Sequence, residues 1–218
     1  MLLTSKITRK GDIMKYLKSK DEDIRESEKL WDSLISSEYY MTMYPILGYG
    51  FQLYAEAIKA FASGAYMATA VMCRATLDAI LYTLISREPK ISGEIIIKEE
   101  VLQEVKRYGV PFIICLAITE GLLIGEEIKT LIKTRNKGNL AAHLVEKVDA
   151  EFKAFFEKYI ELRKQGKTLE MKVELEKFLQ RIAITRDEAL DSLKNTLELI
   201  LKIIERYAEK HPYMRSWR

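Results

Sequence analysis

Apolar residues recur at intervals of three and four through most of the chain, and no segment alternates apolar with polar residues over a convincing length. Intervals of three and four are typical of helices that face a core, whereas a half-buried strand needs a period of two. The only run rich in residues that favour strands, residues 95–97, is too short to form the basis of a sheet. We therefore predict an all-α fold, an up-and-down helical bundle with an added helical hairpin.

A chain of 218 residues is long enough to bury a sizeable core as a single domain. Its two cysteines, Cys73 and Cys115, each lie inside an apolar stretch, which suits buried free thiols in a reducing compartment better than a disulfide. The first residues lack the apolar core of a signal peptide, and charges such as Arg74 and Glu120 interrupt the long apolar runs. We expect a cytoplasmic protein without a membrane span.

The charge balance excludes no large class of partner. The chain holds 35 basic and 32 acidic residues, a net charge of +3, which is too even to mark a nucleic-acid binder by itself. Lys and Glu dominate the charged residues while Asn and Gln are scarce, and this bias suggests the hypothesis of a thermophilic source.

In the N-terminal half, charged residues, prolines and glycines indicate where the predicted segments begin and end. Residues 1–20 are strongly basic, either an arm that contacts phosphates or a solvated terminus, and Ser19 with Glu22 predicts a helix over 20–37. Over residues 38–54, five tyrosines surround a proline and two glycines, which predicts an irregular connection before Phe51 whose rings either stack on bases or cover the core. A helix then follows from Phe51 to a turn at Gly64.

The next helix, near residues 65–86, is apolar on most faces and is predicted to lie at the centre of the bundle. Its only charges, Arg74 and Asp78, stand one turn apart, either as a local ion pair or as part of a functional site. A short amphipathic helix is predicted over 99–108.

The C-terminal part is predicted to form a helical hairpin over 149–183 and a long last helix. Thr185 and Glu188 have capping-box spacing at the start of that helix. Its heptad-like leucines indicate either a dimer seam or packing within its own bundle. We expect residues 211–218, which include His211, to form a flexible tail.

The densest chemical cluster precedes the hairpin. Within nine residues lie Arg135, Asn136, Lys137, Asn139 and His143. In a continuous helix three of them would follow one face, since each residue turns the helix by about 100°. Alternatively the helix breaks at Gly138, and Asn139 caps a new helix whose N-terminus favours anions.

The cluster has the pattern R-x-x-G-N-x-A-A-H, formed by Arg135, Gly138, Asn139, Ala141, Ala142 and His143. This pattern resembles the signature of the HEPN superfamily, and it is most similar to an uncharacterised branch whose upstream helix reads R-x-x-L-[DE], here Arg74, Leu77 and Asp78. The resemblance covers roughly residues 50–145 and the last helix.

The resemblance implies that His143 acts as general acid or base on a ribose 2′-hydroxyl and that Arg135 stabilises charge on the phosphate, without a metal or cofactor. Asn136, Lys137 and Asn139 would contact the substrate, supported by Arg74 and Asp78. It also implies a homodimer, RNA or a nucleotide as ligand, a nucleotidyltransferase-type partner protein and no membrane.

Three functions stay open at this point. The first is a metal-independent RNA endonuclease of the toxin or defence type, using Arg135 and His143. The second is a non-catalytic module that binds nucleotide, nucleic acid or protein through the same cleft. The third is a structural helical dimer or adaptor that uses the last helix.

Overall fold

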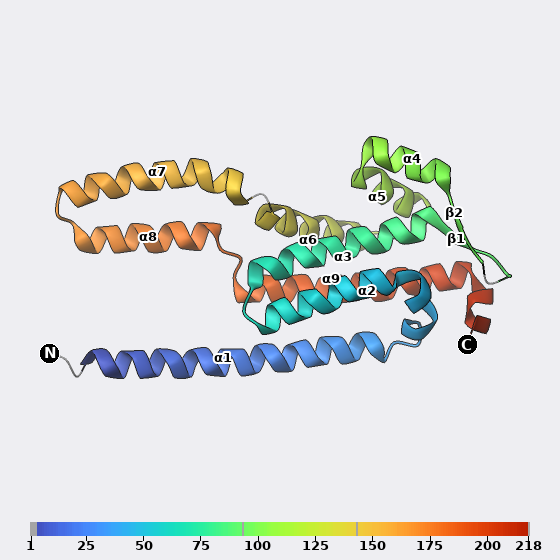
Figure 1. Cartoon of the computed structure of the whole chain (residues 1–218), viewed down its shortest axis with the longest axis horizontal. Coiled ribbons are helices and arrows are strands. Elements are labelled where there is room, and N and C mark those ends of the chain that lie inside the picture. The colour runs from blue at the N-terminus through green and yellow to red at the C-terminus, as the bar shows by residue number, and fades with distance from the viewer. Residues whose placement is uncertain (1–3, 93, 143, 218) are drawn as a thin grey trace.

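The computed structural model describes the backbone of residues 4–92, 94–142 and 144–217, with side chains over 20–92, 94–142, 153, 155–175, 177 and 183–214. This part of the chain is almost entirely α-helical, so the predicted all-α bundle is confirmed (Figure 1). The elements in order are α1 (Thr4–Ile35), α2 (Tyr40–Ala62), α3 (Tyr66–Ser86), β1 (Arg87–Pro89), β2 (Ile95–Ile97), α4 (Glu99–Tyr108), α5 (Val110–Thr119), α6 (Glu126–Ala142), α7 (Leu144–Lys164), α8 (Thr168–Ile182), α9 (Arg186–Lys210) and the 3₁₀ helix η1 (Pro212–Trp217).

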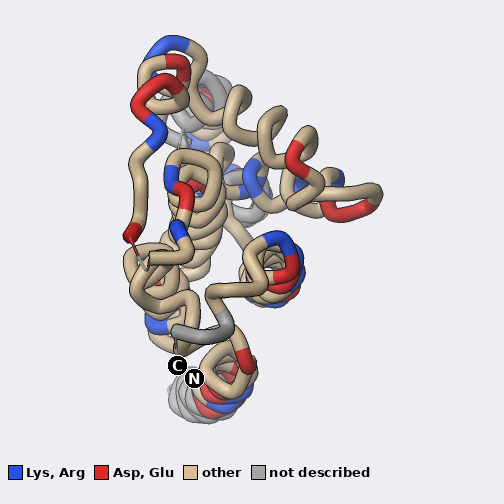
Figure 2. The backbone as a smooth tube through the Cα atoms, turned by 90° about the vertical axis from the view of Figure 1, so that its right-hand side faces the viewer, with Lys and Arg blue, Asp and Glu red and all other residues tan. Residues whose placement is uncertain are grey.

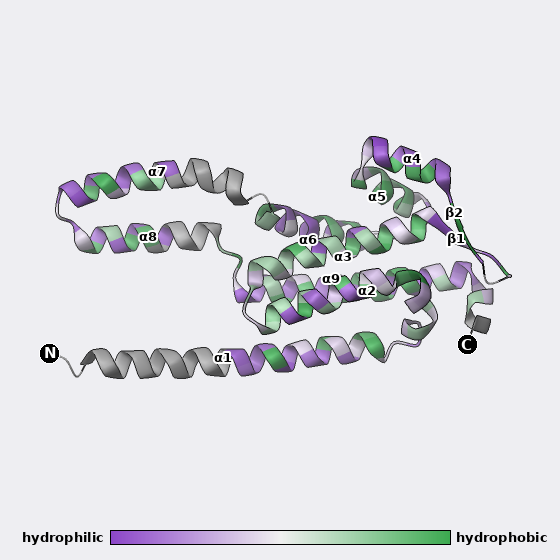
Figure 3. Ribbon diagram, viewed as in Figure 1, coloured by the Kyte–Doolittle hydropathy of each residue, from purple (hydrophilic) through white to green (hydrophobic). Residues whose placement is uncertain are grey.

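Helix α3 lies at the centre of the bundle, packed against α2, α6 and α9. Figure 3 shows hydrophobic residues along much of α3 and over α5. Within the described residues α3 alone is long and apolar enough to cross a membrane, but half of its apolar window is buried inside the bundle. Burial as a core helix accounts for this composition and is compatible with a soluble protein.

Residues 38–50 differ from the prediction of an irregular connection, because α2 runs unbroken from Tyr40 through Pro45 to Ala62. Pro45 lies in the second turn of the helix, where its missing N–H removes one backbone hydrogen bond without ending the helix. A β-carbon on Gly50 would lie 2.5 Å from Cγ1 of Ile80, so this glycine allows α2 to approach α3 closely. Here glycine marks a helix contact rather than a break.

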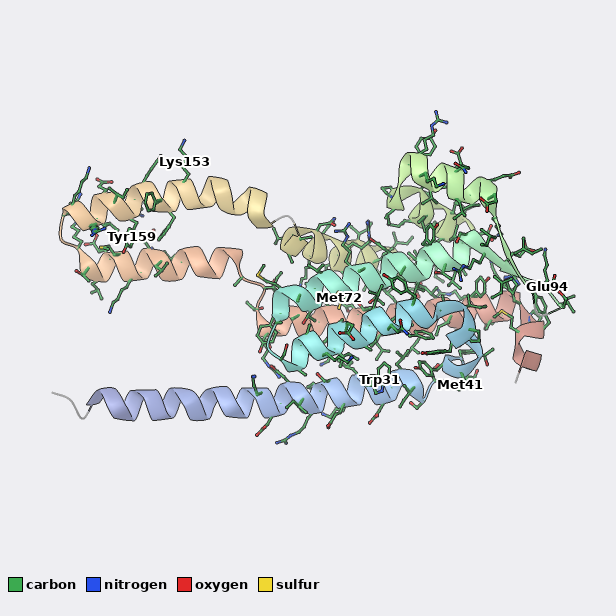
Figure 4. The ribbon with its side chains drawn as sticks, in the orientation of Figure 1. Trp31, Met41, Met72, Glu94, Lys153 and Tyr159 are labelled. Atoms are coloured by element: carbon green, nitrogen blue, oxygen red, sulfur yellow. The ribbon has the colours of Figure 1, made fainter. Side chains whose placement is uncertain are left out.

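Helix α1 also begins earlier than predicted. Its backbone is helical from Thr4 onward, so Ser19 lies inside the helix and is not an N-cap. The C-terminal part of α1 packs along α2 and α9, and Trp31 points toward α2 (Figure 4). There Asp23, which is 1% exposed, accepts hydrogen bonds from Tyr66 Oη at 2.8 Å and from Arg186 Nε at 2.5 Å. This buried carboxylate ties α1 to α3 and α9.

A small β-ribbon closes one end of the bundle. The isoleucine run of β2 pairs antiparallel with β1, with Arg87 opposite Ile97, and Glu94 lies near its tip (Figure 4). The final residues pack here as well: Tyr213 donates a hydrogen bond to the carbonyl of Pro89 at 2.5 Å, and Met214 is fully buried. The stretch expected to be a flexible tail is therefore anchored through these two side chains.

The last helix, α9, packs within its own bundle, since Leu193, Leu197, Ile200 and Ile204 are all buried in the core. This favours the second of the two alternatives drawn from its heptad-like spacing. The capping box at its start is confirmed: the Glu188 amide donates to the Thr185 hydroxyl at 3.2 Å, and the Thr185 amide donates to the Glu188 carboxylate at 3.0 Å.

Helices α7 and α8 form an antiparallel pair that extends past the bundle (Figure 1). They cover the residues predicted as a hairpin, and Gly166 in the turn adopts a φ of +71°. Tyr159 lies between the two helices, and Lys153 points away from them (Figure 4). The pair packs mainly on itself and meets the bundle at the end of α6.

Candidate functional site

Helix α6 runs continuously through Gly138, so the continuous helix is the correct one of the two predicted alternatives and Asn139 is not an N-cap. A β-carbon on Gly138 would lie 2.5 Å from Cβ of Arg74 and 2.7 Å from the carbonyl oxygen of Ala70. Real β-carbons do not approach that closely. The glycine is required because α6 and α3 touch backbone to backbone at this point.

The close approach brings three charged side chains together, which we name the arginine–aspartate cluster: Arg74, Asp78 and Arg135. Arg135 Nε donates to Asp78 Oδ1 at 2.7 Å, and its Nη2 donates to Oδ2 at 3.5 Å. Arg74 Nε lies 3.5 Å from Oδ2 of the same carboxylate. Two guanidinium groups therefore share one carboxylate, and the cluster carries a net charge of +1.

Asp78 pairs with two arginines, and not only with its neighbour on the same helix, Arg74. The predicted contact with Arg74 exists, but the shorter contact is with Arg135, 57 positions along the chain. The side chain of Arg135 is 14% exposed and that of Asp78 17%, against 28% for Arg74. Arg74 is thus the more accessible of the two cations, and Arg135 is the more firmly held.

Two of the other predicted site residues, Asn136 and Lys137, do not share the face of Arg135. Lys137 Nζ lies 3.9 Å from the Glu188 carboxylate of α9, while Asn136 is exposed on the outer side of α6. Each residue turns the helix by about 100°, so these two point away from Arg135. Asn139 follows Arg135 by one helical turn, lies on the same face and is half-buried. His143 lies outside the described residues.

A cavity of about 460 Å³ opens beside Asp78, between α2, α3 and the α4–α5 pair. We call it the tyrosine cavity, because its walls include Tyr49 and Tyr82, which are 68% and 38% exposed. Arg87 also lines it, with apolar walls from Ile46 and other residues. The tyrosines of α2 stand out in the sequence, but Tyr82 and Arg87 lie in the same cavity only because of how α3 packs.

Among the residues whose side chains the structure describes, no three His, Cys, Asp or Glu side chains gather where they could hold a metal ion. What the cluster and the tyrosine cavity provide is positive charge beside aromatic rings. Guanidinium groups bind phosphate through charge-assisted hydrogen bonds, and tyrosine rings stack on bases.

Comparison of the chain with protein-family models, with curated proteins and with solved structures finds no match to any of them. The arginine–aspartate cluster and the tyrosine cavity are therefore the features of this protein that point to a function.

Proposed function

We propose that this protein binds single-stranded RNA at the arginine–aspartate cluster and the tyrosine cavity. The observation that carries the proposal is their adjacency, since Asp78 belongs to both. A backbone phosphate would contact Arg74, whose pairing with Asp78 is long and whose side chain is the more exposed of the two arginines. The neighbouring base would stack on Tyr49 or Tyr82.

The geometry favours binding over cleavage. Arg135, the proposed phosphate-stabilising residue of the motif, already donates to both oxygens of Asp78 and is largely buried. A phosphate would have to compete with a carboxylate that the fold holds in place. Arg135 acts in this proposal as the residue that fixes α6 against α3 and positions Asp78, while Arg74 meets the ligand.

RNA cleavage by His143 and Arg135 is our second proposed function. One observation favours it: α6 continues from Arg135 to Ala142, so no break divides the part of the motif that the structure describes. The HEPN resemblance is part of this second proposal. Cleavage would require Arg135 to exchange Asp78 for the scissile phosphate.

Binding is tested by fluorescence anisotropy with a labelled single-stranded RNA in EDTA. Replacing Tyr49 by Ala should raise the dissociation constant about fivefold to a hundredfold, because a stacked base contributes roughly 1–3 kcal/mol. Phe156→Ala is the matched control, since Phe156 is also an exposed aromatic residue but lies on α7. Equal loss in both variants, or no binding by the wild type, would contradict the proposed site.

The charged half of the site has its own pair of variants. Arg74→Ala should weaken RNA binding about tenfold, the effect of one charge-assisted contact. Lys129→Ala is the control, because Lys129 is an exposed cation of α6 that pairs with Glu126, away from the cluster. An unchanged dissociation constant for Arg74→Ala would remove this residue from the site.

To distinguish RNA cleavage from RNA binding alone, wild type and His143→Ala are incubated with the same RNA in EDTA at several temperatures. If the protein only binds RNA, the RNA stays intact in both samples. Cleavage by the wild type alone would establish the nuclease and make Arg135 the next residue to replace.

A further inference from the structure

A second cavity, which shares only Arg87 with the lining of the tyrosine cavity, lies at the end of the bundle beside the β-ribbon. We call it the terminal cavity. The ends of α3, α5 and α9 surround it together with β1 and the start of α4, and its volume is about 120 Å³. Its apolar walls come from Leu84, Val101, Leu116 and Leu122. Five separate elements thus contribute to one small enclosure.

The rim of the terminal cavity carries five charged side chains. The cations are Arg87, Lys98 and Lys210, and the anions are Glu88 and Glu120. Two of these charges belong to one pair, since Lys210 Nζ lies 3.2 Å from the Glu120 carboxylate. Three cations against two anions leave a net charge of +1. Basic and acidic residues are accordingly intermixed at this end of the molecule, which faces the viewer in Figure 2.

The other two cations, Arg87 and Lys98, are available to a ligand. Glu88 is held by Lys90 at 2.8 Å, outside the lining of the cavity. Among the residues whose side chains are described, no carboxylate lies within 4.0 Å of the charged groups of Arg87 or Lys98. A half-buried cation without a carboxylate partner gains from an anion that enters beside it.

His211 completes the wall as a neutral group of fixed orientation. Its Nδ1 lies 3.0 Å from the hydroxyl of Tyr213, and that hydroxyl donates its single proton to the carbonyl of Pro89. Nδ1 must therefore be the donor, which leaves Nε2 as the unprotonated nitrogen of the ring. Burial lowers the pKa of this imidazole, so the ring adds no positive charge near neutrality.

We propose that the terminal cavity binds a small carboxylic acid as its monoanion, with the carboxylate beside Lys98 and Arg87 and an apolar body against Leu84 and Leu116. The apolar walls favour a carboxylate with an apolar body over a phosphate group, whose oxygens would lose their hydrogen bonds to water against those walls. At about 120 Å³ the cavity is somewhat smaller than the apolar cavity of about 150 Å³ that holds one benzene molecule. The apolar body therefore has at most about six carbon atoms, with the carboxylate outside it at the charged rim.

Calorimetric titration of the full chain tests this proposal with benzoate as the probe and benzyl alcohol as its neutral analogue of the same shape. Benzoate should bind at least about tenfold more tightly, the effect of roughly one charge-assisted hydrogen bond. Equal affinity for the two probes would overturn the anion site and leave only an apolar cavity. No heat from benzoate at millimolar concentration would overturn the proposal altogether.

Variants then locate the anion. Lys98→Met should weaken benzoate binding about tenfold while leaving benzyl alcohol unaffected. Lys106→Met is the control, because Lys106 is an exposed cation of α4 that does not line the cavity. Should Lys98→Met fail to fold, the comparison of the two probes on the wild type still decides.

Discussion

Replacing Gly138 by Ala sets two opposing effects against each other at the contact between α3 and α6. Alanine is the better helix former by about 0.8–1.0 kcal/mol, so in an open helix the substitution would stabilise the protein. At Gly138, however, the new β-carbon would lie 2.5 Å from Cβ of Arg74 and 2.7 Å from the Ala70 carbonyl oxygen. Neither atom is the end of a flexible side chain, so the helices themselves must separate.

The steric effect should win. Overpacking a core contact costs about 1–3 kcal/mol, and the backbone partners place this site toward the upper end. After the gain in helix propensity is subtracted, we expect a net destabilisation of about 1–2 kcal/mol. For a protein of this length that lowers the midpoint of thermal unfolding by roughly 2–8 °C. Separation of the helices should also lengthen the contact between Arg135 and Asp78.

Thermal unfolding followed by circular dichroism at 222 nm measures the effect, with Gly48→Ala as the matched control. Gly48 also lies inside a helix, but its added β-carbon would meet only the ring of Tyr44, at 3.6 Å, an ordinary contact. Gly48→Ala should therefore raise the midpoint by roughly 2–4 °C. If Gly138→Ala raised it by the same amount, the described approach of α6 to α3 would be refuted.

Three further predictions follow from other contacts. Asp23→Asn should cost about 2 kcal/mol in the free energy of urea unfolding, because it removes the nearest and only buried one of the three described carboxylates that pair with Arg186. Asp21→Asn, at an exposed position of α1, should be silent. The hydrogen bond from Arg206 lowers the pKa of Glu127, so the pair stabilises the fold at pH values above the ordinary glutamate pKa of 4.5 and loses this effect as the pH falls through the lowered pKa. Glu127→Gln should therefore make the free energy of unfolding depend less steeply on pH in the acid range. An unchanged dependence would contradict the pairing. Burial raises the pKa of Cys73 to about 12, so a thiol reagent should modify exposed Cys115 in the native protein and reach Cys73 only after unfolding, as mass spectrometry would show.

The fold class and the placement of the central helix could be predicted from apolar spacing alone. Where prediction failed, the cause was a residue whose local preference was overridden by packing. Gly50 and Gly138 were interpreted as turn or break signals, yet both lie inside helices where a second helix approaches too closely for any side chain. Sequence shows that a glycine is present but not which neighbouring segment requires it.

The candidate site was predictable only in its separate pieces. Arg74 and Asp78 could be paired because they lie one helical turn apart, but the shorter contact of Asp78 with Arg135 depends on how α6 packs against α3. The terminal cavity had no signal in the sequence, since its lining comes from five elements. His211 was set aside as part of a tail because the burial of Met214 cannot be inferred from a short polar terminus.

The hairpin of α7 and α8 has a mechanical consequence. It is joined to the bundle through two junctions, one after Ala142 and one at residues 183–185, and it packs mainly on itself. Two points of attachment define an axis, and rotation of the hairpin about this axis is the displacement that its contacts with the bundle oppose least. The first attachment follows α6, the helix that carries Arg135. A load applied at the far turn near Gly166 would act through a lever of about 30 Å, the length of a helix of some 20 residues, and be delivered at the end of that helix.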